Sequence, residues 1–407
     1  MGCEIKGSRL LFLSFAAAMG GFLFGYDTAV INGGEQQIQS QWALGASMHG
    51  WVMSSALWGT VLGAVFGGRV ADRLGRKPAL FWVGVLYFAS AVWSAFAQGP
   101  YSLMAARFIG GLGVGASSIA APVYIAEISP PGRRGRLGGL FQLNIVIGMV
   151  VSQLVNWCLG GIGENAWRWM LGAEAVPALL FASLCPFLDE SPRWLAQGCA
   201  DRRSPAPFFV RGNLRPIMLV FMLAMFNQLS GINAMMYFAK RVFEMAGFSP
   251  QIAFGAAAAL SAVLGVGTFA GLFLIDRLGR RRLLIVGSVG CIVAHFATAL
   301  AFVCGVGLLA ALCIFPFIIF FAMGQGVVIW VFISEIFPQK SRAQGQSFGS
   351  FVHWSFCAVL TFVFPVMAQT WPPWTIFAFF GACLVAHLVW AALVCPETKG
   401  KTLEEIG

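Results

Sequence analysis

Residues 68–77 read GRVADRLGRK, and residues 275–281 repeat the pattern as IDRLGRR. Two other charged signatures recur in the same order, namely Glu127 with Arg134 and Glu335 with Arg342, and Glu190-Ser-Pro-Arg and Glu397-Thr-Lys-Gly. Each second copy follows the first by 204 to 208 residues, which is about half of the 407-residue chain. A near-constant offset of half the length indicates two similar halves that arose by duplication.

Long apolar stretches separate these signatures. Hydrophobic residues make up 58% of the chain and charged residues only 10%, whereas a soluble domain is about a quarter charged. Roughly 20 apolar residues cross the ~30 Å core of a bilayer, because a helix rises ~1.5 Å per residue. About twelve stretches have this length, at 10–31, 48–68, 78–96, 102–125, 137–158, 169–188, 216–239, 252–275, 283–304, 308–333, 346–367 and 374–394.

The sequence therefore predicts an all-α membrane protein of about twelve transmembrane helices in two halves. We expect an N-terminal six-helix bundle at 1–195, a short cytoplasmic linker at 196–213 and a C-terminal six-helix bundle at 214–407.

The positive charge follows the expected topology. Although the net charge is +10, Lys and Arg gather in alternate loops, at 69–77, 133–136, 193–215, 277–282 and 340–342. The other loops hold only Arg168, Lys240 and Arg241. Because positive loops mark the cytoplasmic side, we expect both termini in the cytoplasm. The same alternation argues against a nucleic-acid-binding surface.

The repeated charges in the cytoplasmic loops are candidates for ion-pair networks. Asp72 and Asp276 each lie within one helical turn of arginines. Topology alone does not require an Asp in a basic loop at the same place in both halves, so we expect a latch that holds the halves together while the site opens outward. The alternative is that the charges only set topology and cap helices. The expected cytoplasmic latch comprises Asp72, Arg73, Arg76, Glu127, Arg134, Asp276, Arg277, Arg280, Glu335 and Arg342.

Several motifs in register link the chain to a known family. They are Gly25-Tyr-Asp-Thr28, the two Asp-Arg-Leu-Gly-Arg motifs, Pro122-Val-Tyr-Ile-Ala-Glu127, Glu190-Ser-Pro-Arg-Trp194, Gln228-Leu-Ser-Gly-Ile-Asn233, Ser334-Glu-Ile-Phe-Pro338 and Pro396-Glu-Thr-Lys-Gly400. Together they resemble the sugar porters of the major facilitator superfamily over nearly the whole chain. The resemblance implies that Gln142, Gln228, Asn233 and Trp330 line a sugar site, that Phe24 and Tyr237 act as aromatic gates, and that Asn227, His353 and Trp354 belong to the same site.

The chemistry of these side chains suits a monosaccharide. Amides donate and accept hydrogen bonds, as sugar hydroxyls do, and an aromatic ring such as Trp330 can pack on the C–H face of a sugar. On a regular helix Gln228 and Asn233 would point about 140° apart, but Ser230-Gly231 can break the helix and let both converge. The alternative is that the amides only bridge helices.

The chain departs from the family pattern at several places. Asn227 stands where the family usually has a second Gln, His353 where it has an Asn or Gln, and Leu264 where many members have an Asn. Val327 and Val328 replace prolines expected before Trp330, and Asp189 replaces the proline before Glu190. The central loop, roughly Ala196–Asn213, is short. Without the prolines we expect a stiffer hinge before Trp330. His353 is either a sugar contact or a structural histidine bonded to a neighbouring helix.

Three ionisable residues lie inside apolar stretches, namely Asp27, Arg107 and Glu174. Each is about one to two turns from the extracellular end of its helix, so the three can meet. Intramembrane charges are costly and mark functional sites by default. Two acids face one base, so one carboxylate lacks a full counter-charge and can exchange a proton. The alternative is a purely structural ion pair. The proton-coupled symporters of the family have an acid in the Asp27 motif and match Arg107 and Glu174.

These observations predict a secondary transporter that couples a monosaccharide, a hexose or pentose, to a proton by alternating access. Alternatives are a facilitative uniporter and a sugar receptor that does not transport. We expect no enzymatic step, cofactor, metal site or nucleic-acid partner. The chain should work as a monomer in the lipid bilayer of a plasma or inner membrane.

Overall fold

The computed structural model describes residues 7–130, 134–196, 208–338 and 341–399. Within these ranges twelve helical segments are long and apolar enough to cross a membrane, and the regular structure is helical throughout. The prediction of an all-α membrane protein with about twelve spans is confirmed. Many apolar side chains, such as Phe273 and Leu393, are exposed on these helices, as expected for surfaces that face lipid.

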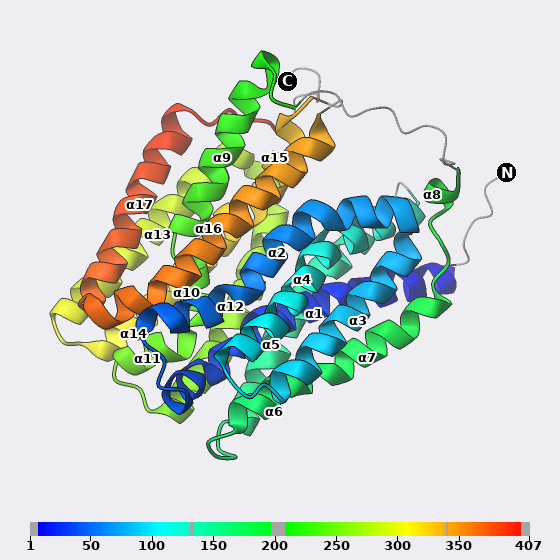
Figure 1. Ribbon diagram of the computed structural model, residues 1–407. Helices are drawn as coiled ribbons and strands as arrows, with labels where there is room; N and C mark the ends of the chain where they lie inside the picture. The colour runs from blue at the N-terminus through cyan, green and yellow to red at the C-terminus, as the bar shows by residue number, and fades with distance from the viewer. Residues whose placement is uncertain (1–6, 131–133, 197–207, 339–340, 400–407) are drawn as a thin grey trace. The chain divides into compact units, whose positions relative to one another are not determined.

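The chain divides into two compact units, Met1–Gly45 with Trp51–Arg203, and Ala46–Gly50 with Ser204–Gly407. Most of the predicted linker at 196–213 lies outside the described residues, so the predicted boundaries stay a prediction. Figure 1 colours the first unit from blue to green and the second from green to red, apart from the short segment at the start of α2.

The first unit is built from helices that approach one another closely through glycines. Its elements are α1 (Gly7–Gln41), α2 (Ala46–Leu74), α3 (Arg76–Ala95), α4 (Pro100–Ile128), α5 (Arg134–Leu159), α6 (Ala166–Ala173), α7 (Ala175–Leu184), η2 (Cys185–Phe187) and α8 (Pro192–Ala196). α1 packs along α5, where a Cβ on Gly25 or Gly148 would overlap the backbone of the facing helix. Small residues allow this close approach in membrane helices.

The second unit contains two interrupted spans. Its elements are η3 (Arg211–Asn213), α9 (Leu214–Leu229), α10 (Ile232–Tyr237), α11 (Ala239–Met245), α12 (Pro250–Leu278), α13 (Arg280–Val303), α14 (Gly307–Phe321), η4 (Ala322–Gly326), α15 (Val327–Ile336), α16 (Arg342–Thr370) and α17 (Pro373–Leu393). α9 runs beside α16, and α13 beside α17 (Figure 1). The first interruption separates α9 from α10 and the second is η4, a π-helical turn.

The repeated Asp-Arg-Leu-Gly-Arg motif forms the same sharp turn in both units. Gly75 joins α2 to α3 with φ +105°, and Gly279 joins α12 to α13 with φ +88°. Glycine adopts this backbone region without the steric cost that a Cβ would bring. Each motif therefore ends one helix and starts the next within a single residue.

Two sequence expectations differ from the structure in detail. The first helix continues well beyond the expected end at residue 31, to Gln41, because its polar last turns bind α6: Gln37 Oε1 accepts from the Trp167 backbone and Gln41 Oε1 from the Trp167 indole. Lys240, expected in a loop, lies in α11, where it is buried and pairs with Glu244 at 3.5 Å.

Candidate functional site

The break between α9 and α10 brings the predicted sugar-site amides together. α9 ends at Leu229, and Gly231 has the left-handed φ of +84° that starts α10. The Nδ2 group of Asn233 consequently donates to Oε1 of Gln228 at 2.5 Å. The convergence expected from Ser230-Gly231 is confirmed. The Ser230 carbonyl, which the break exposes, lies 2.9 Å from Nε2 of the buried His295.

Asn227 and His353 extend this amide group. Nε2 of Gln228 lies 3.1 Å from Oδ1 of Asn227 and 3.1 Å from the ring nitrogens of His353. His353 is therefore bonded to a neighbouring helix, as its structural alternative required, and it also adjoins the predicted sugar residues. Its ring packs against Trp330, with centroids 4.9 Å apart, and against Trp354 at 5.0 Å. Amides, an imidazole and two indoles thus form one cluster in the second unit.

The remaining sugar-site predictions are more dispersed. Tyr237 is buried at the end of α10. Gln142 and Phe24 are half-buried on α5 and α1 of the first unit. Their participation in a sugar site stays a prediction.

The three predicted intramembrane charges lie together in the first unit. Asp27, Arg107 and Glu174 are each at most 2% exposed. Arg107 pairs with the Asp27 carboxylate through Nη1, and its Nη2 donates to the Asp27 carbonyl at 3.1 Å. Glu174 lies beside this pair and interacts electrostatically with both members. One oxygen of Glu174 has no hydrogen-bond partner among the described residues, so the arrangement has two buried acids for one buried base.

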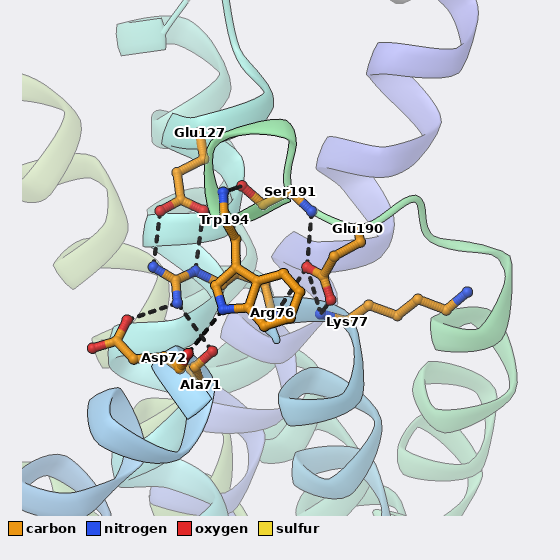
Figure 2. A network of polar contacts seen from close by, with 8 residues as sticks. All are labelled: Ala71, Asp72, Arg76, Lys77, Glu127, Glu190, Ser191 and Trp194. Atoms are coloured by element: carbon orange, nitrogen blue, oxygen red, sulfur yellow. Dashed lines mark hydrogen bonds and ion pairs between the residues drawn. The ribbon is translucent and has the colours of Figure 1, made fainter. Parts of the chain in front are cut away.

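Figure 2 shows a charge network of the first unit that is centred on Arg76 and includes several residues of the predicted latch. Arg76 is buried and donates to both carboxylate oxygens of Glu127, at 3.1 and 3.0 Å, and to Asp72 at 2.7 Å. Oε1 of Glu190 accepts from the backbone N–H groups of Arg76, at 3.0 Å, and Ser191, at 2.8 Å. Trp194 covers the network and donates from its indole to the Asp72 carbonyl.

The second unit repeats this network with Arg280 at its centre. Arg280 donates to Glu335 at 3.1 and 2.7 Å and lies 3.5 Å from Asp276. Glu397 accepts from the backbone N–H of Arg280 at 2.9 Å. Thr398 takes part as well, since its hydroxyl donates to Glu335 at 2.7 Å.

These networks refine the predicted latch. Arg73 and Arg277 are exposed and form no ion pair with any described residue, whereas Arg76 and Arg280 are the central cations. Arg134 and Arg342 were also predicted members of the latch, but their side chains lie outside the described part of the chain. Each network as described joins elements of one unit, so a latch between the halves stays a prediction.

Sequence reasoning missed the part that Glu190 and Glu397 play in these networks. Both carboxylates bind the first backbone N–H groups of a helix that starts more than 100 residues earlier, α3 or α13. A carboxylate at a helix N-terminus satisfies free donors and opposes the positive end of the helix dipole. The sequence did contain a signal for this role, because Glu190 and Glu397 recur at corresponding places in the two halves.

Asp189, a departure from the family pattern, binds the start of α1. Arg9 donates to both Asp189 oxygens, at 3.1 and 2.8 Å, and to the Phe187 carbonyl at 2.8 Å. These hydrogen bonds hold the pKa of Asp189 below its ordinary value. The contact joins the first helix of the unit to the segment after α7.

Comparisons with known proteins agree over the full length. The family model described as "Sugar (and other) transporter" matches residues 13–206 and 200–407. The chain is 31% identical to the D-xylose transporter of Levilactobacillus brevis, over 97% of this chain and 94% of that protein. It is 30% identical to the arabinose-proton symporter of Bacillus subtilis, over 98% and 94%.

Solved structures give the same result. The xylose transporter of E. coli, in a partially occluded inward-open conformation, has a TM-score of 0.86 at 29% identity and covers 97% of this chain and 100% of its own. A crystal structure of a D-xylose-proton symporter has a TM-score of 0.85 at 31% identity, over 96% and 99%.

Proposed function

The chain belongs to the sugar transporter family, and on that premise we propose that it carries a monosaccharide together with a proton across a membrane. It is an integral, multi-pass membrane protein with the architecture of a secondary transporter. The observation that carries the proton-coupled proposal is the buried group of Asp27, Arg107 and Glu174.

The proton half of the proposal follows from charge balance. Arg107 neutralises one carboxylate, and the second buried acid is stable in a membrane interior only when it is protonated or exposed to water. A site that faces each side in turn lets this acid load a proton on one side and release it on the other. In this structure Arg107 binds Asp27, so Glu174 is the acid that holds the proton in this state. We assign the coupling role to Asp27, because protonation of Asp27 would release Arg107 to pair with Glu174 instead.

The sugar half rests on the cluster in the second unit. Gln228, Asn233 and Asn227 offer amide donors and acceptors in one connected group. Trp330 supplies an aromatic face next to them. Relatives named for D-xylose and arabinose support a pentose as the substrate, and the proposal keeps a hexose as the alternative.

The proposal includes alternating access, a monomer, both termini in the cytoplasm of a plasma or inner membrane, and the Arg76 and Arg280 networks as parts of the cytoplasmic closure. Gln142, Phe24, Tyr237 and Trp354 complete the proposed sugar path.

Uptake into proteoliposomes tests the proposal. D-xylose, arabinose and D-glucose are offered with and without an imposed proton gradient, and the internal pH is followed. A potential of 100 mV contributes ~2.3 kcal/mol per charge, which supports roughly 50-fold accumulation for one proton per sugar.

Asp27→Asn should abolish accumulation while sugar counterflow persists, because the amide keeps the shape of the carboxyl but cannot carry a proton. Glu164→Gln, which removes an exposed carboxylate between α5 and α6, is the control and should accumulate sugar like the wild type. Sugar uptake without proton movement would instead identify a uniporter.

A further inference from the structure

A second buried polar group lies behind the sugar-site amides. Nδ1 of His387 on α17 lies 3.1 Å from Nε2 of Gln325 in the π turn η4 and 2.8 Å from Oγ of Ser288 on α13. All three side chains are 0% exposed. Buried polar side chains of this kind are costly unless they are bonded, and no part of the proposed transport chemistry uses them.

This group is connected to the amides by hydrogen bonds. The Gln325 backbone carbonyl accepts from Nδ2 of Asn227 at 3.3 Å. A π turn departs from the regular i to i+4 bonding of a helix, which makes carbonyls available to side chains. From Asn227 the chain of bonds continues to Gln228, and from there to Asn233 and His353.

Close packing against α12 and α13 fixes the backbone of the π turn. A Cβ on Gly324 would lie 2.9 Å from Cα of Gly287 on α13, and one on Gly271 of α12 would lie 2.8 Å from the Met323 carbonyl. His387 itself is held by stacking on Trp390, with centroids 5.7 Å apart, and by Phe226 at 5.4 Å. The Gln325–His387 hydrogen bond therefore joins two rigidly packed elements.

We infer that Gln325 and His387 are positioning residues for sugar binding: their hydrogen bond sets the π turn, and the turn orients Asn227, Gln228 and Trp330. η4 ends at Gly326, four residues before Trp330, so the geometry of the turn also fixes the direction of that indole. The inference rests on the proposed function for its ligand. In this inference η4 supplies the irregular backbone before Trp330, where this chain has Val327 and Val328 in place of the family's prolines.

Two atoms of the group have no hydrogen-bond partner among the described residues, Oε1 of Gln325 and Nε2 of His387. If the group only stabilised the fold, apolar side chains of similar size would serve as well or better. A positioning role predicts instead that such replacements weaken sugar binding more than they weaken the folded state.

The first measurement is sugar affinity, by calorimetry with D-xylose, arabinose and D-glucose on protein in lipid nanodiscs. Gln325→Met and His387→Leu should each weaken binding roughly 10-fold, because a typical hydrogen bond and a stranded buried partner together change an equilibrium by this order. The double variant should bind no more weakly than the weaker single variant. His387→Gln, which keeps a hydrogen-bonding group, should recover most of the affinity.

Ser288→Ala and Ser261→Ala form a matched pair. Both serines are 0% exposed and donate to the carbonyl four residues earlier, but only Ser288 touches His387. Ser288→Ala should weaken binding measurably, about 3-fold, whereas Ser261→Ala should not. If Gln325→Met or His387→Leu fails to fold, the comparison of Ser288→Ala with Ser261→Ala still tests the inference.

The second measurement needs no sugar. The chain has four histidines, so nitrogen NMR of histidine-labelled protein can follow each imidazole. Gln325→Met should shift the signals of His353 as well as those of His387, and Ser261→Ala should shift neither.

Any of three results overturns the inference. Sugar affinity could be unchanged in both single variants, or the losses of affinity could add in the double variant. The third is a His353 NMR signal that does not shift in Gln325→Met. If the wild type binds none of the three sugars, the proposed function fails, and the NMR result alone then decides whether Gln325 and His387 orient the amides.

Discussion

Replacing Arg76 tests which arginine of the repeated Asp-Arg-Leu-Gly-Arg motif stabilises the charge network of its unit. Arg76 is 6% exposed, and Arg76→Met keeps an unbranched apolar side chain while removing five donors. Glu127, whose side chain is only 13% exposed, loses the cation that binds both its oxygens. Breaking a fully buried pair costs about 3–5 kcal/mol. Since Glu127 retains some contact with solvent, we expect a loss of about 2–4 kcal/mol in the free energy of unfolding.

Arg73→Met is the matched control, because Arg73 lies in the same motif but is exposed. It should change the free energy of unfolding by less than about 0.5 kcal/mol. The second unit offers a replicate: Arg280→Met should cost somewhat less than Arg76→Met, since Glu335 is 20% exposed, and Arg277→Met should cost little. Denaturant unfolding of the purified protein in detergent measures all four. An equal loss in Arg73→Met and Arg76→Met would refute the reasoning.

Three shorter predictions concern other parts of the chain. Gly231→Ala should lower the free energy of unfolding by about 2–3 kcal/mol, since the residue has positive φ and its Cβ would lie 2.7 Å from a phenylalanine ring. Gly247→Ala, with positive φ but open space, should cost only about 1 kcal/mol by the same measurement; equal losses would contradict the packing argument. Arg9→Gln should lower the free energy of unfolding only slightly at pH 7, because the pair with Asp189 is exposed. The lowered pKa of Asp189 makes this contribution complete above the unfolded-state pKa of about 4, and the contribution is lost as the pH falls through the folded-state pKa. A difference between wild type and variant that does not shrink as the pH is lowered disproves the pair. His353→Gln should leave sugar affinity within about 3-fold of wild type while His353→Leu weakens it roughly 10-fold; similar calorimetric values for both variants remove the imidazole from the site.

The fold was predictable from the sequence because it depends on features that extend over many residues. Apolar length determines the spans, and the duplicated charges identify the halves. The break before Asn233 was predictable too, since Gly231 can adopt a backbone conformation that other residues avoid.

The details of the site depend on packing that no local pattern reports. Arg73 and Arg76 both lie within about one helical turn of Asp72 in sequence, but the turn at Gly75 places Arg76 at the start of the next helix, inside the network. The π turn before Trp330 has no proline signal. Its Gln325 finds a partner 62 residues away, so only the assembled unit reveals it.

The glutamates that bind the first N–H groups of α3 and α13 have a consequence for synthesis. Glu190 follows Arg76 by 114 residues, and Glu397 follows Arg280 by 117. A ribosome adds roughly 5–20 residues per second, so each of these helices waits on the order of ten seconds before its terminal carboxylate exists. During that interval the turn at Gly75 or Gly279 has open donors at the membrane surface. The network of each half is therefore complete only when the segment after its last span has been synthesised.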